Sequence, residues 1–266
     1  MGRRLLIRPG AIGDFVVSLP ALEFLRDDYT EVWAAGPNVA LGRFADRARS
    51  IASVGLDRLG IVDAADVLER LKTFDSIHSW YGTARPEFRE TVKDLPFTFY
   101  EALPSGNLHA VDFYLDQVGA PLGAKPGSKP HIECRLQRRT ELAIIHPFAS
   151  NVRKRWPLEN FQELAVRLEH LGRVQWCRGP EETLDHAFCV ENLYELGTWL
   201  ATAAVYVGND SGISHLAAAV GTPVITLFGP TDPAIWAPRG VRVTVLGMDS
   251  SVDEVYEIAA KAILAC

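Results

Sequence analysis

The segment VGNDSGISHLAAAVGTPVITLFGPTDP, residues 207–233, has the residue types of a phosphate-binding turn. An apolar run ends before the first glycine, and Gly-Asn-Asp-Ser-Gly then makes a tight turn into a helix of small residues. The N–H groups at such a helix start point at a ligand, and the helix dipole favours negative charge there. We therefore predict that Ser211, Gly212 and Ile213 bind a diphosphate. Asp210 lies next to them and is included in the predicted site.

His215 lies four residues after Ser211, about one helical turn further on and therefore on the same face. It could donate a hydrogen bond to a phosphate or orient Asp210. A single histidine in a helix is more often a core residue bonded to a backbone carbonyl, and this alternative stays open.

A second polar segment, HPFASNVRKRWP at residues 146–157, follows one apolar run and precedes a helical one. Ser150 offers a hydroxyl group, and residues 153–155 are three consecutive cations. In an acidic protein, cations gathered in a loop between a strand and a helix indicate an anion pocket. The alternative is a solvated basic turn, which is common for short charge runs. The adjoining Trp156 favours an ordered loop.

The segment RPGAIGD, residues 8–14, combines two glycines with a carboxylate at the expected start of a helix. Gly10 and Gly13 let the backbone approach a ligand closely. The dinucleotide-binding spacing G-x-G-x-x-G is absent, and a carboxylate would repel phosphate at this position. Asp14 is therefore interpreted either as a helix cap, a common role for aspartate, or as a general base.

Glu181 and Glu182 follow the apolar run RVQWC and the pair Gly-Pro. A carboxylate at the end of such a strand can accept hydrogen bonds from ribose hydroxyl groups. The alternative, a charged helix start, is equally open.

The elements that must position these segments alternate along the chain. Apolar runs predict strands at residues 5–8, 31–35, 50–54, 74–79, 142–146, 173–176, 205–207 and 223–228. Helical spacing predicts helices at residues 63–72, 108–118, 158–171, 191–203, 211–220 and 252–264. The first helix begins near Asp14 and bends at Pro20, or begins at Ser18 with Pro20 in its first turn. This alternation is typical of βαβ units and parallel sheets.

The stretch GAPLGAKPGSKP, residues 119–130, interrupts the alternation with glycine and proline. We predict a first domain at residues 1–125, a linker at 126–140 and a second domain at 141–266. Two α/β domains imply a ligand cleft between them, at the carboxyl ends of parallel strands.

Composition excludes several other classes of protein. The 266 residues are 48% hydrophobic with a net charge of −6, which argues against disorder and against general nucleic-acid binding. The four cysteines form no C-x-x-C pair, which excludes zinc-ribbon and thioredoxin-like sites. The absence of an obvious D-x-D motif agrees with the expectation of no bound metal. No apolar run approaches the roughly 20 residues that a membrane span needs, which favours the cytosol.

Three stretches, in this order, resemble the heptosyltransferases that use ADP-heptose, glycosyltransferase family 9. They are RPGAIGDFVVSLPALEFLR, HPFASNVRKRWPLENFQELA and VGNDSGISHLAAAVGTPVITLFGPTDP. The resemblance implies a GT-B fold, with two Rossmann-like domains whose parallel sheets face across a cleft. It also implies an inverting, metal-independent transfer of a heptose from a nucleotide diphosphate sugar to a saccharide or glycolipid, such as the lipopolysaccharide inner core. The nucleotide sugar is a co-substrate, so no cofactor is expected.

The resemblance also implies roles for individual residues. Asp14 matches the family's base, and Lys154 matches the lysine that contacts the donor phosphate side. The segment from Asp210 to His215 matches the family's diphosphate-binding segment. The acidic residue that meets the adenosine ribose would be Glu181 or Glu182, and the resemblance does not choose between them.

The chain departs from the family pattern in its first half, because it is shorter than typical members and residues 36–139 match little. The acceptor therefore need not be the lipopolysaccharide core. On this side, Trp80 and Arg85 are candidate acceptor contacts beside Gly10 and Gly13.

Three other functions compete with this interpretation: a nucleotide-sugar epimerase or hydrolase on the same fold, a non-catalytic nucleotide-sugar-binding protein, and an NAD-dependent oxidoreductase. The last lacks the glycine fingerprint. We expect a cytoplasmic protein without nucleic-acid partners, and peripheral contact with the inner membrane stays a further expectation.

Overall fold

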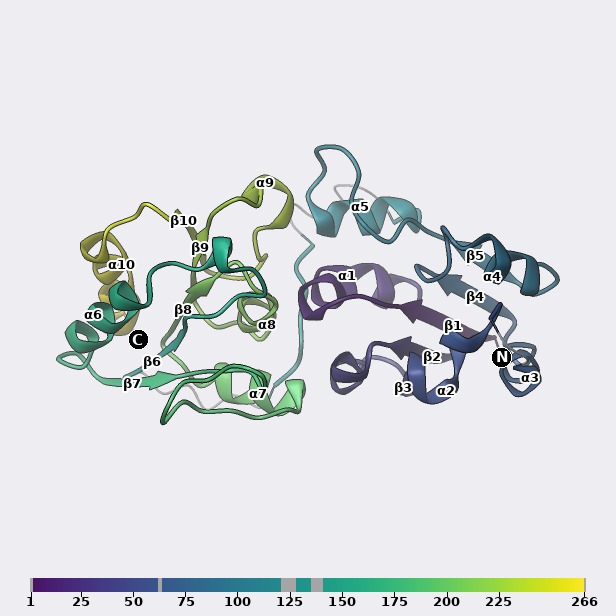
Figure 1. The fold of residues 1–266 in the computed structure, drawn as a ribbon, viewed down its shortest axis with the longest axis horizontal. Helices are drawn as coiled ribbons and strands as arrows, with labels where there is room; N and C mark the ends of the chain where they lie inside the picture. The colour runs from purple at the N-terminus through teal and green to yellow at the C-terminus, as the bar shows by residue number, and fades with distance from the viewer. Residues whose placement is uncertain (1, 62–63, 121–127, 135–140, 266) are drawn as a thin grey trace. The chain divides into compact units, whose positions relative to one another are not determined.

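The computed structural model describes residues 2–61, 64–120, 128–134 and 141–265. The chain divides into two compact units, residues 1–126 and 127–266, each built around its own sheet (Figure 1). Asp63, the predicted start of a helix, lies outside the described residues.

The first unit holds a five-stranded parallel sheet in the order β3-β2-β1-β4-β5. Its strands are β1 (Arg3–Arg8), β2 (Tyr29–Ala34), β3 (Arg47–Ser50), β4 (Ser76–Ser79) and β5 (Phe97–Phe99). Leu5, Leu6 and Ile7 of the central strand β1 are completely buried. Such a continuous apolar run is expected for a parallel strand covered on both faces.

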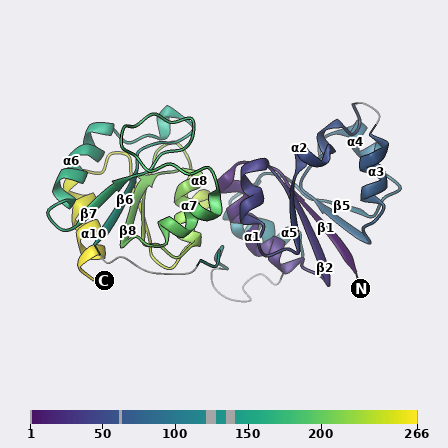
Figure 2. The same ribbon diagram turned by 90° about the horizontal axis from the view of Figure 1, so that it is seen from below.

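Helices cover both faces of this sheet. They are α1 (Ile12–Phe24), α2 (Ile51–Val54), α3 (Ala65–Leu71), α4 (Pro86–Thr91) and α5 (Ala110–Gln117), with 3-10 turns η1 (Gly36–Leu41) and η2 (Leu56–Arg58). Figure 2 shows α1 and α5 on one face and α2, α3 and α4 on the other. The second face covers an apolar core that includes Trp33, Phe74 and Phe88.

The strand predicted at residues 50–54 is wrong. The strand β3 ends at Ser50, and Ile51–Val54 forms the short helix α2. Gly55 ends this helix in the left-handed conformation, with φ of +74°. A glycine in that conformation is a usual helix stop, so the apolar run IASV before a glycine also suits a helical turn.

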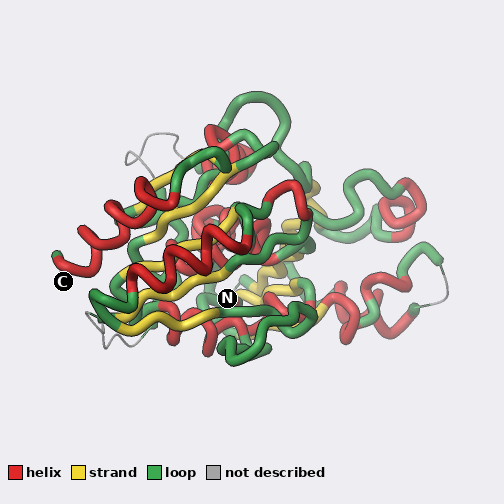
Figure 3. Tube along the Cα trace, turned by 60° about the vertical axis from the view of Figure 1, so that its left-hand side comes forward, coloured by secondary structure: helices red, strands yellow, loops and turns green. Residues whose placement is uncertain are grey.

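The second unit holds another five-stranded parallel sheet, in the order β10-β9-β8-β6-β7. Its strands are β6 (Leu142–His146), β7 (Arg173–Trp176), β8 (Val205–Asn209), β9 (Val224–Phe228) and β10 (Val243–Gly247). Its helices are α6 (Leu158–Leu168), α7 (Leu193–Leu200), α8 (Gly212–Ala219), α9 (Pro233–Trp236) and α10 (Val252–Leu264), with the 3-10 turn η3 (Val152–Lys154). Figure 3 shows strands and helices alternating, with α10 as the last helix.

The core of the second unit lies between its sheet and the packed pair α6 and α10. Helices α7 and α8 pack together and cover the opposite face (Figure 2). Helix α8 is buried almost along its whole length, because its alanines and its glycine let it lie close to the strands.

Part of the predicted linker makes hydrogen bonds to the second unit. Residues 128–134 have no helix or strand. The Ile132 amide donates to Ala219 O at 3.0 Å, and the Tyr194 hydroxyl donates to Glu133 O at 3.2 Å. This stretch therefore belongs with the second unit.

Among the described residues, no helix is long and apolar enough to cross a membrane.

Candidate functional site

Each sheet has one switch point, where the chain stops adding strands on one side of the sheet and continues on the other side. In the second unit this place lies between β6 and β8, because β7 follows on one side and β9 on the other. Ligands of open parallel sheets bind at the carboxyl ends of the two strands that flank such a switch point. The polar segment 146–157 and the turn 208–212, both singled out by the sequence, lie at these two strand ends.

The turn after β8 leads into the start of α8. Ser211 is the N-cap residue in extended conformation, and its side chain makes no capping hydrogen bond. Ser214 stabilises the turn by donating its hydroxyl to Asn209 O at 2.5 Å. The amides that begin α8 are thus not used by a side-chain cap, which suits an anion at Ser211, Gly212 and Ile213.

Lys154 and Asp210 form an ion pair across these two segments. Lys154 Nζ lies 2.7 Å from Asp210 Oδ2, and the two side chains are 26% and 7% exposed. An unpaired carboxylate would repel phosphate next to a helix start. The structure thus brings together two residues predicted as separate diphosphate contacts, and it makes Asp210 a partner of the lysine.

The rest of the cationic loop is shaped by Arg155. Its guanidinium donates from Nε and Nη2 to Ala149 O, at 2.9 and 2.7 Å, and so folds the loop back on itself. Ser150 and Arg153 are both exposed. His215 is buried in α8, 6% exposed. The roles of Ser150 and His215 stay predictions.

Glu182 differs from its neighbour Glu181 in how it is held. Its Oε2 accepts the Gly179 amide at 2.5 Å and lies 3.1 Å from His146 Nε2, at the end of β6. Burial alone would raise the pKa of the Glu182 carboxyl, but His146, the Gly179 amide and Arg155 together lower it. Glu181 is exposed. Both of these contacts use Oε2, so Glu182 is held through one carboxylate oxygen.

In the first unit the switch point lies between β1 and β4. Helix α1 begins at Ile12, with Pro20 inside it, so the earlier of the two predicted helix starts is confirmed. Asp14 Oδ2 accepts the Ala11 amide at 3.0 Å, which caps this helix. The carboxylate is only half-buried. A cap and a solvent-facing carboxylate therefore coexist at Asp14.

Gly10 has to be a glycine. Its φ is +110°, and an added Cβ would lie 2.9 Å from Asp14 Cβ. The Asn38 side chain donates to Gly10 O at 3.1 Å and helps to hold this turn. Gly13 lies inside α1.

Arg8 supports the same turn and was missed by the sequence reasoning. It is 1% exposed, and it donates from Nε to Ser18 Oγ and from Nη2 to Asp14 O, both at 3.0 Å. Its guanidinium lies 4.5 Å from the centre of the Tyr114 ring. Burial lowers the pKa of Arg8. A cation hidden under a glycine-rich turn leaves no periodic signal in the sequence.

The prediction that Trp80 contacts an acceptor needs correction. Trp80 is 1% exposed and stacks on Tyr100 with ring centres 4.7 Å apart, so its ring belongs to the core. An aromatic residue that follows a short strand has the same sequence pattern whether it faces the core or a ligand. Arg85 is half-buried, and its guanidinium is hydrogen-bonded to the Tyr81 hydroxyl.

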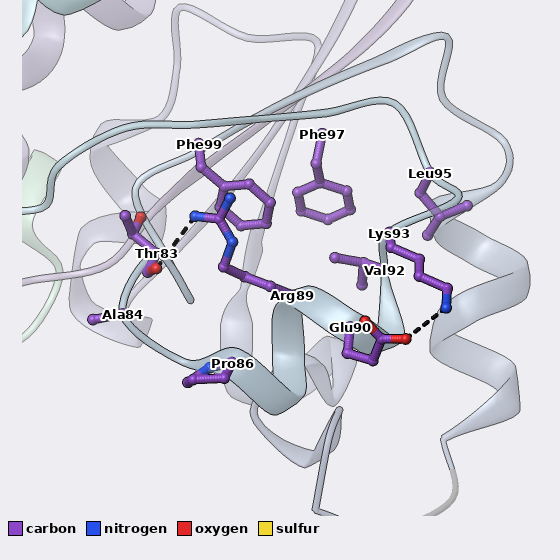
Figure 4. Close-up of a pocket in the computed structure, with 10 residues that line it drawn as sticks. All are labelled: Thr83, Ala84, Pro86, Arg89, Glu90, Val92, Lys93, Leu95, Phe97 and Phe99. Atoms are coloured by element: carbon purple, nitrogen blue, oxygen red, sulfur yellow. Dashed lines mark hydrogen bonds and ion pairs between the residues drawn. The ribbon is translucent and has the colours of Figure 1, made fainter.

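A separate hollow of about 620 Å³ lies between α4 and β5 (Figure 4). Arg89 crosses it, lies 4.6 Å from the Phe99 ring centre and donates to Thr83 O at 3.4 Å. Lys93 is paired with Glu90 at 2.5 Å. None of the residues that the sequence predicts for the site lines this hollow.

Among the described residues, no group of three or more His, Cys, Asp or Glu side chains is placed to hold a metal ion.

Comparison with known proteins supports the family resemblance. Residues 108–258, more than half of the chain, match the family model of glycosyltransferase family 9 (heptosyltransferase). Lipopolysaccharide heptosyltransferase 3 of Escherichia coli strain K12 is 32% identical over 114 residues, covering 36% of this chain. That alignment spans only 33% of the relative's own length.

Two solved structures share the fold along the chain. A glycosyltransferase family 9 protein from Veillonella parvula has a TM-score of 0.79 and 17% identity, covering 100% of this chain and 98% of its own. The ADP-heptose lipopolysaccharide heptosyltransferase II of Escherichia coli has a TM-score of 0.75 and 19% identity, covering 99% of each chain.

The chain therefore belongs to glycosyltransferase family 9, the heptosyltransferase family. Its two parallel α/β units have the GT-B fold of the heptosyltransferases, as the sequence predicted.

Proposed function

We propose that this protein is an inverting, metal-independent glycosyltransferase. It moves a heptose, or a related sugar, from a nucleotide diphosphate sugar to a saccharide acceptor. The observation that carries the proposal is the pair Lys154–Asp210, 2.7 Å apart, at the uncapped start of α8. This arrangement sets a cation and backbone N–H groups around one point, which suits a diphosphate.

ADP-heptose is the proposed donor, because a relative of the same fold is named for that substrate. In this chain the diphosphate binds the amides of residues 211–213 and Lys154. The ribose binds Glu182 rather than Glu181, because Glu182 is held by His146 and Gly179 through one carboxylate oxygen.

The acceptor is proposed to be a saccharide or glycolipid such as the lipopolysaccharide inner core. The support is the Escherichia coli relative described above, which is named a lipopolysaccharide heptosyltransferase. Asp14 is the proposed base. Its carboxylate removes the proton of an acceptor hydroxyl, whose oxygen attacks the anomeric carbon as the bond to the diphosphate oxygen breaks. The charge that develops on the leaving diphosphate is met by Lys154 and the α8 amides.

The proposal places the reaction in the cytoplasm, where nucleotide sugars are available, with a glycolipid acceptor presented at the inner membrane. The competing functions are a non-catalytic binding protein and an epimerase or hydrolase. The assay described next separates them from a transferase.

The test is a donor-consumption assay with ADP-heptose, with and without a lipopolysaccharide core acceptor, and with EDTA in excess. We expect ADP release that requires the acceptor and is unchanged by EDTA. Release without an acceptor would indicate a hydrolase. Binding of ADP without any release would indicate a binding protein, and loss of turnover in EDTA would contradict metal independence.

A further inference from the structure

The side chain of Asn209 connects the two segments of the proposed donor site. Asn209 is the last residue of β8 and is completely buried, so it cannot touch a ligand. Its Nδ2 donates to Pro147 O at 2.9 Å, and its Oδ1 accepts the Trp156 amide at 2.9 Å. One amide group therefore holds both ends of the loop 147–156 on the strand next to it.

This loop carries the proposed diphosphate lysine. Within it, the Lys154 amide donates to Asn151 O and the Arg155 amide donates to Val152 O, at 2.9 and 3.0 Å. Lys154 Nζ reaches Asp210, the residue directly after Asn209. The Asn209 side chain thus holds the backbone amide of Trp156. The next residue, Asp210, holds the charged side chain of Lys154.

Asn209 is itself fixed from the opposite side. Its carbonyl oxygen accepts the Ser214 hydroxyl, whose oxygen lies 3.2 Å from the Tyr206 hydroxyl in the core. A supporting side chain that is itself fixed by hydrogen bonds can hold a binding residue in place without contacting the ligand.

We propose that Asn209 is a positioning residue for the donor site, which sets Lys154 against the start of α8. The inference rests on the proposed function, because it concerns the same diphosphate site. A displacement of about 1 Å in a binding group can lower kcat/KM about a hundredfold. Loss of the two Asn209 hydrogen bonds is therefore expected to lower ADP affinity and kcat/KM about tenfold to a hundredfold.

The first test needs no ligand. Asn209→Leu removes both hydrogen bonds and keeps the branching and the number of heavy atoms of the side chain, and amide hydrogen exchange is followed across residues 150–160. We expect faster exchange at Lys154 and Arg155, whose hydrogen bonds do not involve Asn209. Unchanged exchange at these two amides would overturn the inference. Asn209→Ser, too short to reach both Pro147 and Trp156, serves if the leucine variant does not fold.

Thr222→Val is the matched control. Thr222 is 1% exposed and its hydroxyl donates to Leu200 O at 2.8 Å, so the change also removes a buried hydrogen bond from the second unit. We expect a similar fall in melting temperature with no change in ADP affinity. Equal losses of ADP affinity in the two variants would show a general stability effect and contradict positioning.

The second test uses ADP as the probe, with calorimetry on the wild type, Asn209→Leu, Lys154→Ala and the double variant. If Asn209 acts through Lys154, the double variant binds ADP about as weakly as Lys154→Ala alone. Additive losses would overturn the inference. A wild type that binds no nucleotide diphosphate would instead overturn the proposed function, while the exchange measurement would still decide the role of Asn209 in the loop.

Discussion

At Asp14 one carboxylate has to satisfy a helix start and, in the proposed reaction, a proton transfer. The hydrogen bond from the Ala11 amide uses Oδ2 and orients the group at the first turn of α1. The carboxylate is half-buried, so it can still meet an acceptor hydroxyl. The two roles predict different outcomes for different substitutions.

Asp14→Asn keeps a side-chain oxygen for the Ala11 amide but removes the base. We expect kcat to fall about 10²–10⁴-fold, because general base catalysis contributes about that much. ADP affinity and melting temperature should stay close to wild type. The measurement is the initial rate of ADP release with saturating donor and acceptor. A variant with near-wild-type kcat would leave Asp14 as a helix cap only.

Glu182→Gln tests the choice between the two neighbouring carboxylates. A hydrogen bond to a charged group contributes about 1 kcal/mol more than a neutral one, so we expect ADP affinity to fall several-fold to about tenfold. Glu181→Gln is the control and should bind ADP like the wild type, because Glu181 is exposed. Calorimetry with ADP measures both. An effect at Glu181 and none at Glu182 would reverse the assignment.

At the scale of elements, segments with a clear hydrophobic run or period are the most predictable part of the sequence. The bounds of β6, β7 and α10 agree with the prediction to the residue. β6 is a continuous apolar run and α10 has clear helical spacing, whereas the partly exposed β7, RVQW, alternates polar and apolar residues. The turn after β8 could also be predicted, because its glycines and polar residues separate an apolar strand from a helix of small residues.

Other elements could not be predicted for physical reasons. The helix α4 and the strand β5 are short, and the three residues of β5 carry too little periodicity to be recognised. The contacts Lys154–Asp210 and Glu182–His146 join residues 56 and 36 positions apart. Such contacts depend on which strands are neighbours in the sheet, and the sequence pattern does not encode strand order.

Gly208 shows how closely packed β8 is at the site. An added Cβ would lie 2.5 Å from the buried Tyr206 hydroxyl and 3.0 Å from His146 O. Gly208→Ala is therefore expected to destabilise the protein by about 1–3 kcal/mol, as overpacked cores do, in urea unfolding followed by circular dichroism. Gly36→Ala is the control, since its added Cβ would meet only Ser50 Oγ, at 3.9 Å. Equal stabilities of the two variants would contradict this account.

At the scale of the whole molecule, both sheets place their candidate residues by the same rule. Arg8 is the last residue of β1, Gly10 and Asp14 follow it, and Lys154 and Asp210 follow β6 and β8. Each of these strands flanks the switch point of its own sheet. The candidate residues therefore lie at strand ends or in loops that the strands support. Titratable groups within the sheets themselves are expected to affect the stability of the whole protein.

His78 in β4 is such a group. Its ring stacks on Tyr100, and its Nδ1 lies 2.8 Å from the Tyr100 hydroxyl. Burial, and then the charge of Arg4, lower the pKa of His78 to about 4 from its ordinary 6.5. Between these two values the unfolded chain binds more protons than the folded protein. This difference lowers the free energy of unfolding as pH falls from about 6.5 towards 4.

His78→Gln removes this titration but keeps an acceptor for Tyr100. Allowing for solvent screening of a partly exposed ring, we expect the wild type to lose roughly 1–2 kcal/mol more than the variant between about pH 7 and pH 5. Urea unfolding at the two pH values measures the difference, and other titrating groups cancel in the comparison. Equal losses in both proteins would mean that His78 takes up its proton in the folded sheet as readily as in the unfolded chain.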